Sequence, residues 1–150
     1  MKLLIPPPLV ALACAGLIWA SSLYIPQLGF EFAEQRNIAI VIGILGIAID
    51  IFSVRLFFKN NTTVNPHDPS KSEWLVTTGI YRFTRNPMYV GMALLLIAVG
   101  IWFGNWSFVP STALFILYLT RYQIIPEEQM LRSKFGEAYE KYCEKVRRWI

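Results

Sequence analysis

Four long apolar runs constrain this chain more than any other feature of its sequence. They cover about residues 8–25, 38–58, 87–103 and 107–125. Each has roughly 17–21 residues, which is enough for a helix to cross the hydrocarbon core of a bilayer. In lipid, only helices and closed barrels satisfy the backbone hydrogen bonds, and these runs lack the alternation of a barrel strand. The sequence therefore predicts an all-α integral membrane protein with four transmembrane helices.

Composition agrees with one membrane unit spanning residues 1–150. The chain is 55% hydrophobic and 16% charged, which is too apolar for a soluble domain of this size. The first run begins after Lys2 like a signal peptide, but Pro6, Pro7 and Pro8 interrupt it and no small-residue cleavage site follows. We therefore expect a retained first span.

With one histidine, His67, and two cysteines at opposite ends of the chain, no metal-ligand spacing exists.

The basic residues are segregated along the chain. Arg36 is one of 14 Lys and Arg residues, and the other 13 fall near the two termini, in the loop 59–86 or beside the spans that flank them. The connections 26–36 and 104–106 carry only Arg36. The positive-inside rule predicts that both termini and the 59–86 loop face the cytoplasm. We expect the protein in the cell (inner) membrane. This segregation explains the basic excess as a topology signal, so we expect no nucleic acid partner.

The segment after the fourth run has a different pattern. Leu131, Phe135, Tyr139, Tyr142 and Val146 recur at steps of three and four residues, and charged residues occupy the other face. This pattern predicts an amphipathic helix over about residues 127–147.

The first polar motif, YRFTRNPMY, stands directly before the third run at residues 81–89. Asn86 suits a helix N-cap and Pro87 the first helical position, so part of the motif marks where a helix begins. Arg82 and Arg85 are either membrane anchors or functional residues. A helix N-terminus also favours an anion or a carboxylate, which makes this a candidate binding site.

The second motif is Pro126-Glu127-Glu128. Acids in the first turn of a helix stabilise its dipole by about 0.3–1 kcal/mol, which is one explanation for them. The other is that a glutamate binds hydroxyls or an ammonium group of a ligand. Adjacent residues point in different directions on a helix, so the two glutamates are expected to have separate roles.

Asp50 lies inside the second run, where an acid costs roughly 2.5–3.5 kcal/mol at the helix centre. It should therefore face a partner or a polar cavity. Arg82 and Arg85 are the partners we expect, and both a structural ion pair and a catalytic role stay open.

The segments LVTTGIYRFTRNPMYVG and EEQMLRSKFGEAYEKYCEKVRRWI, joined by a hairpin, resemble a family of membrane enzymes. They are similar to the isoprenylcysteine carboxyl methyltransferase and phospholipid N-methyltransferase superfamily, in detail over about residues 62–150. The resemblance implies S-adenosylmethionine as methyl donor, in a cytoplasm-facing pocket that the tail helix covers. By matching positions, the residues that line this cofactor would be Trp74, Leu75, Val76, Tyr81, Asn86, Pro87, Met88, Tyr89 and Glu127.

The same resemblance implies that Arg85 and Glu128 sit toward the methyl acceptor. The arginine that carboxyl methyltransferases use for substrate has no counterpart here, since Gln123 takes its place, and Arg121 would substitute for it. The implied acceptor is a small lipophilic or lipid-linked carboxylate, thiol or amine.

Two alternatives remain. Membrane reductases of the steroid type, which use NADPH, share an Arg-(His)-Pro-x-Tyr entry to a late span, although the Glu127-Glu128 pair favours the methyltransferase. A non-enzymatic membrane accessory protein would use the same motifs only as anchors and caps.

Overall fold

The fold is a bundle of helices, and a computed structural model describes it for residues 5–59 and 75–150. In chain order the helices are α1 (Pro7–Tyr24), α2 (Gln35–Lys59), α3 (Pro87–Phe103), α4 (Phe108–Leu119), α5 (Ile125–Phe135) and α6 (Glu137–Lys145). Short helical turns are η1 (Pro26–Leu28), η3 (Gly79–Arg82) and η4 (Thr120–Ile124). Within these two ranges the only β pairing is one isolated bridge between Gly29 and Asn105. The prediction of an all-helical chain is confirmed for this part.

Apolar helices identify the chain as an integral membrane protein. Among the described residues, three are long and apolar enough to cross a bilayer: Pro7–Tyr24, Gln35–Leu56 and Phe108–Phe135. The third predicted run forms α3, an apolar helix of 17 residues. Large side chains such as Leu12, Trp19 and Val41 are more than half exposed on α1 and α2. Apolar faces of this extent indicate contact with lipid.

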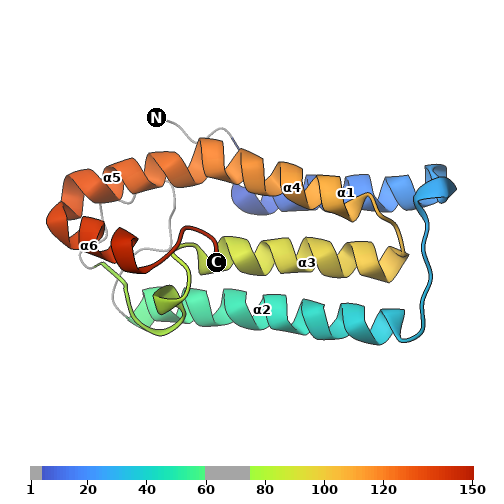
Figure 1. Cartoon of the computed structure of the whole chain (residues 1–150), viewed down its shortest axis with the longest axis horizontal. Helices are drawn as coiled ribbons and strands as arrows, with labels where there is room; N and C mark the ends of the chain where they lie inside the picture. The colour runs from blue at the N-terminus through green and yellow to red at the C-terminus, as the bar shows by residue number, and fades with distance from the viewer. Residues whose placement is uncertain (1–4, 60–74) are drawn as a thin grey trace.

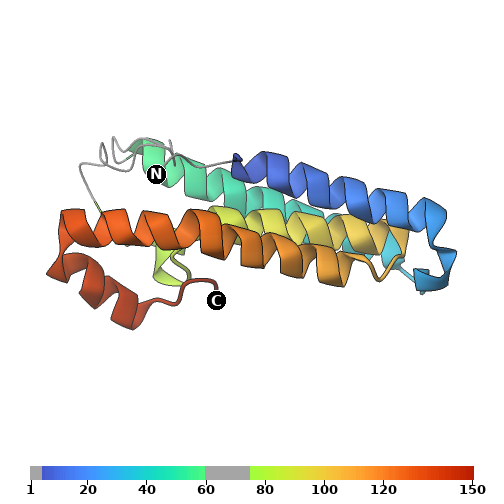
Figure 2. The ribbon, with the colours of Figure 1, turned by 90° about the horizontal axis from the view of Figure 1, so that it is seen from above.

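Helix α3 occupies the centre of the bundle and contacts α1, α2 and α4 (Figures 1 and 2). Its buried residues lie on several sides, as expected for a helix surrounded by others. A Cβ atom at Gly46 of α2 would lie 2.9 Å from the carbonyl oxygen of Gly91, so the two backbones meet directly there. The helix begins at Pro87 and stops before Gly104, whose φ of 60° is a common helix ending.

The tail is not one helix, as the sequence predicted for residues 127–147. It forms α5 and α6, which are separated at Gly136. Gly136 has a φ of 51°, a backbone conformation that favours glycine and ends the first helix. Figure 1 shows α6 folded back at the end of the bundle where the chain terminates. The apolar period continues across Gly136, and for this reason it did not reveal the break.

Helix α4 continues into α5 through the π-helical turn η4. The backbone N–H of Ile125 donates to the carbonyl oxygen of Thr120, five residues earlier. Pro126 has no N–H, so the carbonyl of Tyr122 cannot receive its usual α-helical hydrogen bond. The wider turn accommodates this missing donor. Turns of this kind often occur at functional sites, and this one leads directly into Glu127 and Glu128.

Replacing Gly100 with valine is expected to destabilise the contact between α3 and α4. A Cβ atom at this position would overlap the Cβ and Cγ atoms of Phe108. Overpacking of this kind typically costs about 1–3 kcal/mol, so the free energy of unfolding should fall by that amount. Unfolding by sodium dodecyl sulfate, followed by circular dichroism, measures the change. Gly16→Ala is the control because no atom lies within 4 Å of its new Cβ, and an equal loss in both variants would contradict the packing described.

Candidate functional site

Two predicted motifs meet at one end of the bundle. We call this the motif end and define it by residues 81–89 and 123–128. The phenol of Tyr89 in α3 donates to the carboxylate of Glu127 in α5, at 3.1 and 3.3 Å from its two oxygens. The side-chain amide of Gln123 donates to the same carboxylate. Tyr89 is buried, whereas Glu127 is partly exposed. The Glu127 carboxylate is thus oriented by two donors, on a residue that is only partly buried.

Glu128 turns to a different set of partners, as expected for adjacent glutamates. Its carboxylate accepts two hydrogen bonds from the Arg148 guanidinium, at 2.9 and 2.8 Å. It also pairs with Arg85 at 3.2 Å. The hydrogen bonds from Arg148 to Glu128 raise the pKa of the Arg148 guanidinium above its ordinary value. Glu128 is buried, so its charge is balanced by two arginines from distant parts of the chain.

The last residues of the chain run across the start of α3. We call residues 146–149 the tail strap. The backbone N–H of Arg85 donates to the carbonyl of Arg147 at 3.0 Å. The side-chain amide of Asn86 donates to the carbonyl of Arg148 at 2.9 Å. Asn86 therefore occupies the N-cap position of α3 without capping it through its side chain. The indole N–H of Trp149 donates to Thr120 at the π turn, at 3.1 Å.

Sequence reasoning missed the tail strap. Arg148 and Trp149 lie beyond α6 in a segment with no helical period, so no pattern singled them out. The available signal was two consecutive arginines followed by a tryptophan at the end of an amphipathic segment.

Two buried tyrosines join the tail to the η3 turn. The phenol of Tyr142 in α6 donates to the carbonyl of Tyr81 at 2.7 Å. Burial raises the pKa of both phenols, and for Tyr81 the nearby groups Tyr142 and Glu127 raise it further. Both side chains are therefore neutral at physiological pH.

The other predicted site residues are distributed unevenly. Leu75 packs against the cluster of Tyr139, Tyr142 and Val146. Val76 and Met88 are partly buried, and Pro87 is buried at the start of α3. Arg121 is exposed on η4. Trp74 and His67 lie outside the described residues.

One donor atom of Arg85 lacks a partner among the described residues. Its guanidinium contacts the thiol of Cys143 and pairs with Glu128. Its Nε is buried and makes no hydrogen bond to any residue in the described ranges. Most buried donors in proteins are paired, so this atom is an exception within the site.

Asp50 is separate from this cluster. Its Oδ1 atom is buried against Gly91, on the face of α3 that meets α2, and it finds no hydrogen-bond partner within 5–59 and 75–150. The expected pairing with Arg85 is wrong, because that side chain binds Glu128 instead. Arg82 is exposed and does not pair with Asp50 either.

Comparisons with known proteins find membrane methyltransferases and a sterol reductase. A family model described as phospholipid methyltransferase matches residues 35–138. Protein-S-isoprenylcysteine O-methyltransferase of Schizosaccharomyces pombe is 42% identical over 80 residues, covering 51% of this chain and 33% of that protein. A probable protein-S-isoprenylcysteine O-methyltransferase of Oryza sativa subsp. indica is 30% identical over 128 residues, covering 83% and 65%.

A Delta(14)-sterol reductase of Gallus gallus is 28% identical over 151 residues, covering 90% of this chain and 24% of that protein. The chain thus spans less than two thirds of the length of each of these three relatives.

Proposed function

The chain belongs to the phospholipid methyltransferase family, and from that premise we propose that it transfers a methyl group from S-adenosylmethionine to a lipophilic or lipid-linked acceptor. The observation that carries this proposal is the convergence of three distant segments at the motif end. The segments that meet there around Glu127 and Glu128 are residues 81–89, 123–128 and 142–149. They bring a carboxylate, an amide, buried phenols and a guanidinium together at the edge of an apolar bundle.

The residues present suit S-adenosylmethionine chemically. This donor carries ribose hydroxyls, an ammonium group, a carboxylate and a sulfonium. Glu127 is a partly exposed residue, and its carboxylate oxygens can accept further hydrogen bonds from hydroxyl or ammonium donors. The Nε of Arg85, which has no partner among the described residues, suits a carboxylate of the donor or the acceptor. In this proposal Leu75, Val76, Tyr81, Asn86, Pro87, Met88 and Tyr89 form the remaining wall, with Trp74 and Arg121 as further candidates.

The protein's contribution is to position the two reactants. When bound, S-adenosylmethionine supplies an electrophilic methyl group, which passes to the acceptor's nucleophile as the carbon–sulfur bond breaks. Tyr89 and Gln123 fix the Glu127 carboxylate, and Arg148 fixes Glu128, so that both are oriented before ligands arrive. Correct placement of reactants lowers a barrier by several kcal/mol, up to roughly 7–11 in ideal cases. Glu128 lies between two arginines and acts by holding Arg85 in place.

The proposal also includes the arrangement in the membrane. The four spans, which belong to one unit over residues 1–150, are α1, α2, α3 and the continuous helix from α4 into α5. The motif end and both termini face the cytoplasm, in the inner membrane. A water-soluble donor then enters from the cytoplasm, and an apolar acceptor reaches the same place from the bilayer.

Incubation with radiolabelled donor tests the proposal and identifies the acceptor. Membranes containing the protein are mixed with methyl-labelled S-adenosylmethionine and a total lipid extract, and the organic phase is separated by chromatography. We expect a labelled lipophilic product that is missing from membranes without the protein. The labelled species reports whether oxygen, sulfur or nitrogen accepts the methyl group.

The similarity to a sterol reductase supports a second candidate, an NADPH-dependent membrane reductase. Thermal unfolding of the purified protein with each ligand distinguishes the two. Stabilisation by S-adenosylmethionine alone supports the methyltransferase, and stabilisation by NADPH alone supports the reductase. If neither ligand shifts the unfolding temperature, the accessory-protein alternative is favoured.

A further inference from the structure

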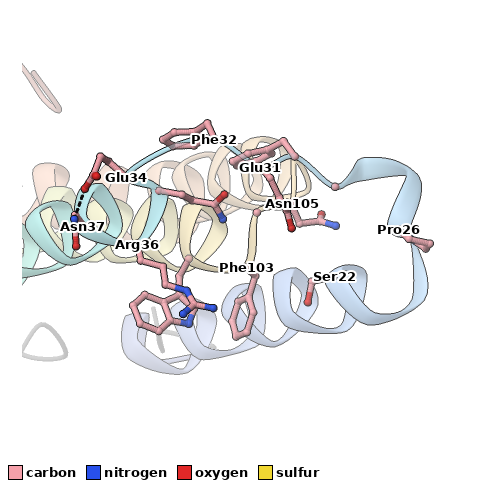
Figure 3. A pocket seen from close by; sticks show the side chains of 14 residues that line it. Ser22, Pro26, Glu31, Phe32, Glu34, Arg36, Asn37, Phe103 and Asn105 are labelled. Atoms are coloured by element: carbon pink, nitrogen blue, oxygen red, sulfur yellow. Dashed lines mark hydrogen bonds between the residues drawn. The ribbon is translucent and has the colours of Figure 1, made fainter.

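The opposite end of the bundle, which we call the turn end and define by residues 22–37 and 102–107, contains an open hollow of about 1060 Å³. It lies between the last turn of α1, the first turn of α2 and the end of α3 (Figure 3). Ser22, Arg36, Trp102 and Phe103 are among its lining residues. The methyl-transfer proposal makes no use of this region.

Arg36 is the cation of the hollow. Its guanidinium carbon lies 5.9 Å from the centre of the Trp102 ring. Figure 3 shows that Arg36 extends from α2 toward Phe103. Among the described residues, no carboxylate lies within ion-pair distance of Arg36, and Glu34 on the same turn accepts a hydrogen bond from Asn37 instead. A guanidinium held over an indole ring keeps its N–H donors available, in a geometry that matches phosphate.

The surroundings of the hollow favour a lipid over a soluble anion. Trp102 and Trp106 are 46% and 54% exposed at this end, as is typical of tryptophans at a membrane–water interface. α1 and α2, which flank the hollow, also carry exposed apolar side chains, for example Leu23 and Val41. α1 and α2 pack chiefly against α3 rather than against each other. A ligand with a phosphate and apolar chains fits both parts of this surface.

A carboxylate on the rim indicates the type of headgroup. Glu31 lines the hollow and is exposed, and it forms no ion pair with any residue described here. An ammonium group that follows a phosphate can approach this carboxylate and the neighbouring aromatic rings. We propose that the hollow binds the headgroup of a zwitterionic, ethanolamine-type phospholipid, with the phosphate on Arg36 and the ammonium group facing Glu31. The bound lipid links the ends of α1, α2 and α3.

Lipid binding to delipidated protein in detergent tests this site. Short-chain phosphatidylethanolamine and phosphatidylglycerol are titrated against the wild type, and affinity is read from the rise in unfolding temperature. Arg36→Ala is expected to lower the affinity for phosphatidylethanolamine roughly tenfold, because a charge-assisted hydrogen bond is lost. Arg132→Ala is the matched control, since it removes an exposed arginine of α5, which is not part of the turn end. Circular dichroism and gel filtration verify that each variant is folded.

Glu31→Gln is expected to remove the preference for phosphatidylethanolamine over phosphatidylglycerol and to leave phosphate binding in place. Equal affinity of wild type and Arg36→Ala would overturn the site. Equal affinity of the wild type for the two lipids would overturn the assignment of the headgroup. Binding of S-adenosylmethionine at the motif end should be the same in all these variants, so the outcome does not depend on the proposed reaction.

Discussion

Replacing Glu127 with alanine is expected to lower the affinity for S-adenosylmethionine by roughly 10- to 100-fold, the effect of losing one hydrogen bond to a charged group. Among the described residues of the motif end, Glu127 is the only partly exposed acid whose carboxylate accepts hydrogen bonds from two side chains. Its loss removes an acceptor for the ligand's hydroxyl or ammonium groups. Equilibrium binding of labelled donor to purified protein measures the change.

Two further variants sharpen this test. Tyr89→Phe keeps the ring but removes the phenol that orients Glu127, so a smaller loss of affinity is expected. Glu140→Ala, an exposed acid on α6, is the control and should bind like the wild type. Wild-type affinity in Glu127→Ala would exclude this carboxylate from the donor site.

Replacing Glu128 with alanine is expected to cause the largest loss of stability. The substitution leaves Arg85, whose side chain is only 12% exposed, without its opposite charge. Removing one partner of a buried ion pair typically costs about 3–5 kcal/mol. We expect the low end, about 3 kcal/mol, because Arg148 is 36% exposed and can recover hydration. Unfolding in mixed micelles of sodium dodecyl sulfate and a mild detergent gives the free energy.

Glu137→Ala is the matched control for this prediction. Glu137 also pairs with a basic residue, Lys141 at 2.7 Å, but both side chains are more than two thirds exposed. Exposed pairs one helical turn apart contribute about 0.3–0.5 kcal/mol. Similar losses in the two variants would show that Glu128 is not the buried link between the tail strap and Arg85.

The local chemistry of the sequence predicted the bounds of α3 to the residue. α3 spans Pro87 to Phe103 as expected, because the Asn-Pro pair and Gly104 mark its two ends within the backbone itself. The contact between Tyr89 and Glu127 fits the resemblance to a family, which implied that both residues line the same pocket. The break at Gly136 was missed, since an apolar period reports side-chain faces and not the backbone angle of one glycine.

Other features depend on contacts between distant residues, which a single sequence does not encode as a pattern. Carbonyl groups of the tail strap accept hydrogen bonds from Arg85 and Asn86, which lie more than 60 positions earlier in the chain. Backbone acceptors of this kind have no residue signature. The position of Asp50 beside Gly91 is similar, because it depends on how α2 rotates against α3. In both cases packing selected the partner among several that the sequence allowed.

The central claim is that the three segments at the motif end form one binding site for S-adenosylmethionine. Ultraviolet cross-linking of methyl-labelled donor to the purified protein, followed by peptide mapping, tests it most directly. We predict saturable labelling, competed by unlabelled donor, of peptides that contain Tyr81, Tyr89 or the segment around Glu127. Labelling confined to peptides of the turn end, or no saturable labelling, would contradict the claim.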